Sequence, residues 1–109
     1  MELQIGTIKN LQKYIASKIT ERGFEDESLR ERLVLLMEEI GELAKACRKI
    51  SGMNINKDTK TQDNVGGEVA DVINFVFAVA IKLGIDMEKE FRAKEIIVDK
   101  RIYERSKIT

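Results

Sequence analysis

The stretch that decides the fold is residues 29–50, which read LRERLVLLMEEIGELAKACRKI. Its apolar residues recur at alternating steps of four and three, namely Leu29, Leu33, Leu36, Ile40, Leu43, Cys47 and Ile50. This spacing places them along one side of an α-helix. Ser28 precedes the stretch and Glu31 stands three residues later, a pattern typical of a capping box at a helix N-terminus. Residues 29–50 are therefore predicted to form an amphipathic helix with Cys47 in its core-facing stripe.

Helical spacing also dominates on both sides of this stretch. It predicts further helices over about residues 7–21, 65–82 and 87–105, whereas the polar segment 53–64 is predicted to be a surface loop. The turn and capping signals between the helices are Gly23, Gly84 and Asp86. Four helices with mostly short connections predict an all-α fold, an antiparallel four-helix bundle that occupies the chain, 1–109, as a single domain.

The predicted helix over residues 65–82 is apolar on nearly every side. A helix without a polar face has to be buried all round. The other helices of a 109-residue chain do not readily surround it, because a small domain buries only part of its surface. We therefore expect an oligomer, a homodimer or a homotetramer, packed around this helix.

The composition excludes several classes of function. Lys and Arg total 19 and balance 19 Asp and Glu, so nothing favours a nucleic acid polymer as a partner. The chain has no His, which excludes Ser-His-Asp catalysis, and its single Cys excludes an internal disulfide. Residues 72–83 form the most apolar run, but it is too short to span a membrane, and residues 1–12 lack the pattern of a signal peptide. A cytoplasmic protein without a membrane partner is expected.

Two acidic pairs interrupt the apolar pattern: Glu39 with Glu42, and Glu68 with Asp71. Residues three apart are neighbours on one helix face, so each helix offers two carboxylates together. On a helical wheel Glu39 lies between apolar residues, where an unpaired charge is costly to bury. A cation held between the two helices is the common partner that would offset much of this negative charge. Oxygen-only ligands favour Mg²⁺, with Mn²⁺ as the alternative.

Two other interpretations of the acidic pairs stay open. Most Glu-x-x-Glu pairs in charged helices are simply solvated, although two pairs on adjacent helices weaken that interpretation. A buried ion network with Lys82 or Lys94 is the second, but two lysines do not balance four carboxylates. A ferritin-like di-iron site is excluded because it requires His.

A carboxylate-bound Mg²⁺ commonly bridges a protein to phosphate groups, so one or more such ions could hold a nucleoside triphosphate by its phosphate chain. Such an ion neutralises charge that develops at phosphorus and lowers the pKa of an attacking water. Glu38 adjoins the pairs on the polar side of its helix and is a candidate to orient that water or to bind a further ion. An ordinary surface glutamate is the alternative. The candidates to contact the phosphates are Lys45, Arg48, Lys94 and Arg101.

Residues 36–46, LMEEIGELAKA, and residues 67–73, GEVADVI, together resemble the MazG-like nucleotide pyrophosphohydrolases of the all-α NTP pyrophosphatase superfamily. The resemblance covers roughly residues 29–103. It implies a helical bundle that works as a dimer or tetramer. It also implies Mg²⁺-dependent hydrolysis between the α- and β-phosphates, giving a nucleoside monophosphate and pyrophosphate, and a role in cleaning the nucleotide pool. By motif match, the metal ligands are Glu39, Glu42, Glu68 and Asp71.

The end of the domain departs from the family pattern. Family members often carry a Lys, an Asn four residues on, and then an Arg. Lys94 and Arg101 fit this spacing and are implied to contact the substrate, but Val98 stands where Asn is usual. The departure leaves the contacts to sugar and base open, and the aromatic candidates for a base contact are Phe24, Phe75 and Tyr103.

Two alternative functions accompany this resemblance. One is phosphoribosyl-ATP pyrophosphatase, although the local order of glutamates and glycine fits that branch less well. The other is a non-catalytic helical module of the same fold, used for oligomerisation or regulation.

Overall fold

The computed structural model describes residues 7–52 and 65–108, with side chains placed as far as Arg101. Four helices make up the regular structure of these residues: α1 (Ile8–Glu21), α2 (Leu29–Ile50), α3 (Val65–Lys82) and α4 (Met87–Ile108). The predicted all-α, four-helix fold is confirmed. The loop predicted over residues 53–64 lies outside the described residues. None of the described helices is long and apolar enough to cross a membrane.

The helix ends follow the local sequence. The capping box is formed as predicted: the Ser28 hydroxyl accepts the Glu31 N–H at 3.0 Å, and the Glu31 carboxylate accepts the Ser28 N–H at 3.4 Å. Asp86 accepts an N–H from the first turn of α4 at 3.2 Å. After α1 and α3 the chain turns at Gly23 and Gly84, whose φ angles of 82° and 69° favour glycine.

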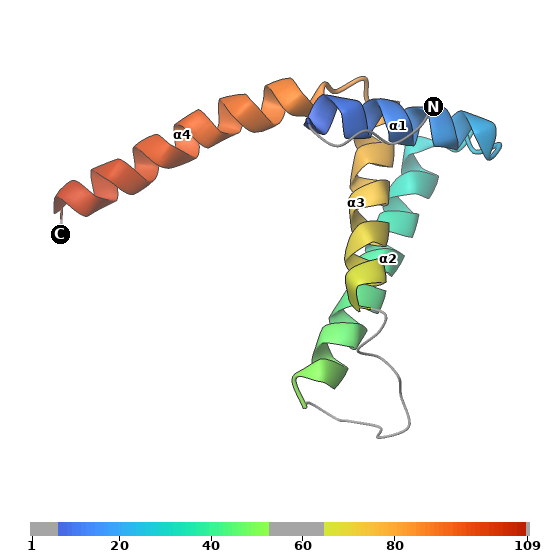
Figure 1. The fold of residues 1–109 in the computed structure, drawn as a ribbon, viewed down its shortest axis with the longest axis horizontal. Helices are drawn as coiled ribbons and strands as arrows, with labels where there is room; N and C mark the ends of the chain where they lie inside the picture. Colours follow the sequence, from blue (N-terminus) through green and yellow to red (C-terminus); the bar gives the residue numbers. More distant parts are fainter. Residues whose placement is uncertain (1–6, 53–64, 109) are drawn as a thin grey trace.

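The helices are arranged around an antiparallel pair (Figure 1). α2 and α3 lie side by side along most of α3 and form the main packing contact of the protomer. α1 lies across the end of this hairpin at which α3 finishes, and it packs against α3 and the start of α4. α4 then leads away from the hairpin, so the protomer is open on the side that α4 leaves.

The face of α2 that meets α3 is one residue away from the stripe that the sequence predicted. Its buried positions are Arg32 and Ala46, and Glu39 lies midway between them with partial exposure. Leu36 and Leu43 of the predicted stripe are also partly covered and border this face. The predicted stripe residues that remain exposed in the protomer include Leu33, Ile40 and Cys47. The prediction that Cys47 lies in the core is therefore wrong for the protomer. Because each residue turns a helix by about 100°, a shift of one position leaves part of the apolar stripe outside the α2–α3 contact.

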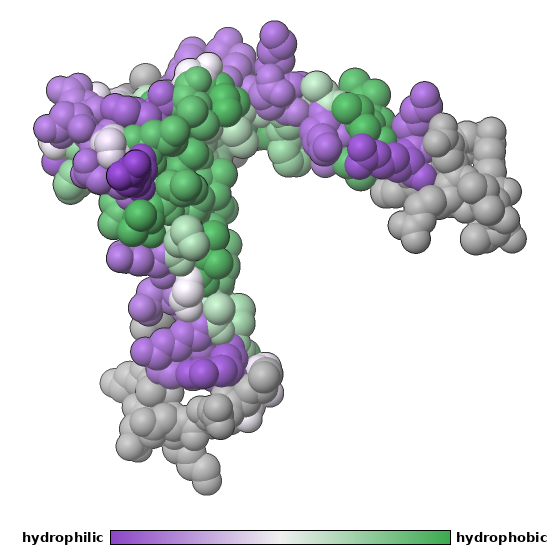
Figure 2. Space-filling model, turned by 180° about the vertical axis from the view of Figure 1, so that it is seen from behind, coloured by the Kyte–Doolittle hydropathy of each residue, from purple (hydrophilic) through white to green (hydrophobic). Residues whose placement is uncertain are grey.

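Large apolar side chains remain uncovered on the hairpin and on α4. Figure 2 shows hydrophobic residues gathered over the upper part of the hairpin. On α3, Phe77 is buried while Val69 and Ile73 are each 42% exposed, so its apolar cylinder is only partly covered. Met37 on α2 and Ile96 on α4 are 66% and 72% exposed. This surface supports the predicted oligomer, which stays a prediction.

A single amide side chain joins α1 to the turn between α3 and α4 and to the first residue of α4. Gln12 of α1 donates from Nε2 to the carbonyl of Ile85 at 2.8 Å and accepts the Met87 N–H through Oε1 at 2.9 Å. Beside it, the Glu88 carboxylate accepts the Lys9 N–H at 3.1 Å. These bonds fix the turn between α3 and α4 against α1, and so set the direction in which α4 leaves.

Candidate functional site

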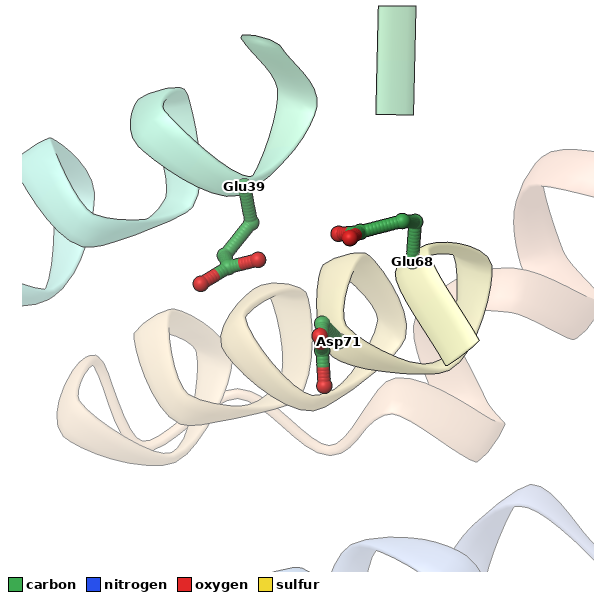
Figure 3. Close-up of side chains that lie close together, drawn as sticks. All are labelled: Glu39, Glu68 and Asp71. Atoms are coloured by element: carbon green, nitrogen blue, oxygen red, sulfur yellow. The ribbon is translucent and has the colours of Figure 1, made fainter. Parts of the chain in front are cut away.

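Three carboxylates meet between α2 and α3 (Figure 3). Glu39 comes from the middle of α2, and Glu68 and Asp71 come from the first two turns of α3. One oxygen of each side chain lies within 4.8 Å of one oxygen of each of the others. Glu68 reaches toward Glu39 across the gap between the helices. We refer to Glu39, Glu68 and Asp71 as the acidic group.

The helix geometry explains why these residues meet. Glu39 lies at the centre of the buried face of α2, midway between Arg32 and Ala46. Glu68 and Asp71 are three residues apart, so they share one side of α3. The acidic group is therefore built into the main helix contact of the protomer. Glu39 and Glu68 are half-buried, and Asp71 is exposed at the edge.

The environment disfavours the charged form of Glu39. Desolvation by partial burial raises the pKa of its carboxyl, and the negative charges of Asp71 and Glu68 raise it further, with smaller contributions from Glu42 and Glu38. Within the described residues, the ion pairs lie elsewhere and none includes a member of the acidic group. A proton or a bound cation would relieve the repulsion.

The donor set fits a hard divalent cation. All three side chains offer carboxylate oxygens, the ligands that Mg²⁺ prefers, and no nitrogen or sulfur donor belongs to the group. Two oxygens bound to one Mg²⁺ at about 2.1 Å are at most about 4.2 Å apart. The separation of up to 4.8 Å would therefore close by a small change of side-chain rotamer. Such a site leaves coordination positions for water and phosphate oxygens.

A family model supplies the decisive comparison. The model for phosphoribosyl-ATP pyrophosphohydrolase matches residues 7–95, a span that includes α1, α2, α3 and the whole acidic group. The chain belongs to the phosphoribosyl-ATP pyrophosphohydrolase family. No curated protein matches it as a relative.

Membership of this family places the chain in the all-α NTP pyrophosphatase superfamily, as the sequence analysis inferred. A pyrophosphohydrolase, an enzyme that hydrolyses phosphoric anhydrides, is therefore the established class. The match supports the superfamily and does not single out the MazG-like branch that the motifs resemble.

Other residues predicted for the pyrophosphohydrolase site lie outside the acidic group. Glu42 and Glu38 are exposed on α2 near Glu39, and Lys45 is exposed further along the same helix. Lys94 and Arg101 are exposed on α4, which leads away from the hairpin that carries the acids. The protomer thus brings together three of the four predicted metal ligands, while the roles of the remaining residues stay predictions.

The sequence did not point to a buried arginine, Arg32, on the same face of α2 as Glu39. Arg32 is 2% exposed, donates from Nη1 to the carbonyl of Ala78 at 2.7 Å and from Nη2 to the carbonyl of Phe24 at 3.2 Å. Its Nε lies 3.8 Å from a Glu27 carboxylate oxygen and makes no hydrogen bond. The available signal was its spacing: Arg32 precedes Glu39 by seven residues and so shares its helix face.

Proposed function

We propose that the protein is a Mg²⁺-dependent nucleoside triphosphate pyrophosphohydrolase. The observation that carries the proposal is the acidic group, in which three carboxylates from two helices lie within reach of one cation. The reaction adds water across the anhydride between the α- and β-phosphates and yields a nucleoside monophosphate and pyrophosphate. Removal of unwanted nucleotides from the cellular pool is the role that this activity would serve.

Glu39, Glu68 and Asp71 would hold the ion. When bound, the ion would neutralise phosphate charge and lower the pKa of a coordinated water. Glu42 lies one turn from Glu39 and would complete the ligand set by a change of rotamer. Glu38 would accept a proton from the attacking water or orient it, because it adjoins the group on the solvent side.

Two substrate classes have separate support. The local order of residues 36–46 and 67–73 resembles the MazG-like branch and favours ordinary or modified nucleoside triphosphates. The matched family model favours phosphoribosyl-ATP. Val98 stands at the usual Asn position of the MazG-like pattern. This departure does not favour one substrate class over the other, but it favours a changed contact to the sugar or base.

Self-association is part of this proposal. The exposed apolar residues of α2, α3 and α4 would be covered by a second copy, in a homodimer or homotetramer. In such an assembly, α4 of one copy would bring Lys94 and Arg101 to phosphates held by another. Light scattering at several concentrations would test this, and a monomer at every concentration would contradict it.

The test of the activity is pyrophosphate release in the presence of Mg²⁺. The substrates are a panel of canonical and modified nucleoside triphosphates together with phosphoribosyl-ATP. We expect release from at least one, its loss in Glu39→Gln and Asp71→Asn, and its retention in Glu95→Gln, which removes an exposed acid on α4. If Mg²⁺ stabilises the protein but no substrate releases pyrophosphate, the non-catalytic module is the better description.

A further inference from the structure

A cavity of about 220 Å³ lies beside the acidic group, between α1, α3 and the connection from α1 to α2. Asp71 belongs to both the acidic group and the wall of this cavity. Asn74 and Phe75 follow on α3, and Lys18 and Arg22 line the cavity from α1. The cavity therefore begins at Asp71 and is lined on its α1 side by these two basic residues, while Glu27 adds an acidic group from the connection between α1 and α2.

The remaining wall carries an aromatic side chain that the fold holds in an exposed position. Phe24 lines the cavity while 51% of its surface is exposed. Its backbone is fixed at both ends, because its N–H donates to the carbonyl of Ile19 at 2.9 Å and its carbonyl accepts from the buried Arg32. Aromatic rings held in this way provide stacking surfaces for nucleobases.

The size and chemistry of the cavity fit one end of a nucleotide. Its volume is below the roughly 300 Å³ of the smallest pockets that enclose a whole drug-sized ligand, so it would hold a base and leave the rest of the molecule at its mouth. Phe24 and Phe75 offer ring faces, and Asn74 offers both a donor and an acceptor for a base edge. Lys18 and Arg22 offer positive charge for a phosphate.

We propose that this cavity receives the nucleoside end of the substrate, and that Lys18 and Arg22 contact the phosphate that adjoins it. The proposal rests on the proposed function, since it places the β- and γ-phosphates at the acidic group and the base beyond Asp71. α1 then supplies the basic residues that α4, which leads away from the hairpin, does not supply within the protomer.

The present contacts of the two basic residues leave them available for this role. Lys18 pairs with Glu21 at 3.0 Å, but Glu21 is 61% exposed, and such surface pairs contribute little. Arg22 is the C-cap residue directly after α1, where a positive charge also complements the helix dipole. A purely structural role at the helix end would affect stability without affecting nucleotide binding, so the two roles can be separated.

The test uses nucleoside monophosphates, which lack the anhydride and need no catalysis. AMP, GMP, CMP and UMP are titrated calorimetrically into the full-length protein, with and without Mg²⁺. We expect at least one to bind, and Arg22→Gln and Phe24→Leu each to weaken that binding about 10-fold. Arg30→Gln, which removes an exposed arginine outside the cavity wall, serves as the matched control and should bind as the wild type does.

The outcomes separate this inference from the activity itself. Glu39→Gln should lose hydrolysis and keep monophosphate binding, whereas Arg22→Gln should raise KM for the triphosphate more than it lowers kcat. Phe24 is exposed, so Phe24→Leu tests the cavity without a large effect on folding, and circular dichroism confirms the fold of each variant. Absence of binding by all four monophosphates, or equal affinities for wild type, Arg22→Gln and Phe24→Leu, would overturn the inference whether or not the protein is an active hydrolase.

Discussion

Replacing Glu39 with glutamine is expected to stabilise the metal-free protein and to remove its response to Mg²⁺. Glu39 is half-buried between apolar neighbours and lies within 4.8 Å of two other carboxylates through its nearest oxygens. Without a cation, its charge is repelled by both and is partly desolvated, which is why its pKa is raised. Glutamine has nearly the same shape and no charge, so the substitution removes the repulsion and one metal ligand together.

The geometry gives the size of the effect. Two unit charges 4.8 Å apart repel by about 0.9 kcal/mol at the dielectric constant of water and by about 3.5 kcal/mol at an effective value of 20. Because Asp71 is exposed and Glu68 only half-buried, the lower value applies to each pair. The two pairs, Glu39 with Asp71 and Glu39 with Glu68, together destabilise the folded protein by about 1 to 2 kcal/mol. For a domain of this size, each kcal/mol raises Tm by roughly 4–8 °C, so we expect a rise of at least about 4 °C.

The assay is thermal unfolding at fixed protein concentration over a range of Mg²⁺ concentrations. The wild type should gain about 2.7 kcal/mol when Mg²⁺ reaches 100 times its Kd, because the ion binds the folded state. Glu39→Gln should melt higher than the wild type without Mg²⁺ and gain little from it. Glu95→Gln, on α4, should behave as the wild type in both conditions. A variant that melts no higher than the wild type without metal, or that keeps the full Mg²⁺ response, would refute the reasoning.

Three further predictions follow from other features. The pKa of Glu39 is raised above 4.5 in the folded state, so its destabilising charge is present above the raised pKa and is lost as the pH falls toward 4.5. Without metal, the difference in Tm between Glu39→Gln and wild type should therefore shrink from pH 7 to about pH 5. Arg32→Ala should lower the free energy of unfolding, measured by urea titration, by about 3–5 kcal/mol, because it leaves Glu27 and two carbonyls without their buried partner. The control Arg30→Ala, at an exposed position, should lower it by less than about 0.5 kcal/mol. Gly84→Ala should destabilise the folded protein by about 1 kcal/mol, because the φ angle of 69° at this position is strained for alanine. Calorimetry of the variant would measure this loss, and an unchanged Tm would contradict it.

The sequence predicts the local structure well because its signals are local. The Ser28 capping box, the Asp86 cap and the glycine stops depend on residues within a few positions of each other, and the structure forms each of them. The pairing of Glu68 with Asp71 likewise depends only on helix periodicity. The meeting of these two with Glu39 required one further assumption, that consecutive helices pack as neighbours, and α2 and α3 satisfy it.

The features that the sequence does not predict depend on the rotation of α2 about its own axis and on the packing of helices that are far apart in the sequence. Apolar spacing in α2 favours the stripe through Leu33 and Ile40, yet the helix presents Arg32 and Glu39 to α3. Hydrophobic periodicity does not reveal that the Arg32 guanidinium has a carbonyl partner 46 positions away, at Ala78. The cavity depends in the same way on α1 meeting α3, which no local pattern encodes.

The amide of Gln12 has a mechanical consequence. α4 is 22 residues long, about 33 Å, and it is anchored at its first residue, where Gln12 accepts the Met87 N–H. Lys94 and Arg101 lie about 10 and 21 Å along this arm. A tilt of about 10° at the anchor would displace them by about 2 and 4 Å, the difference between a direct contact with a phosphate and none. The two hydrogen bonds of the neutral Gln12 side chain on α1 thus control the positions of charged groups far along α4.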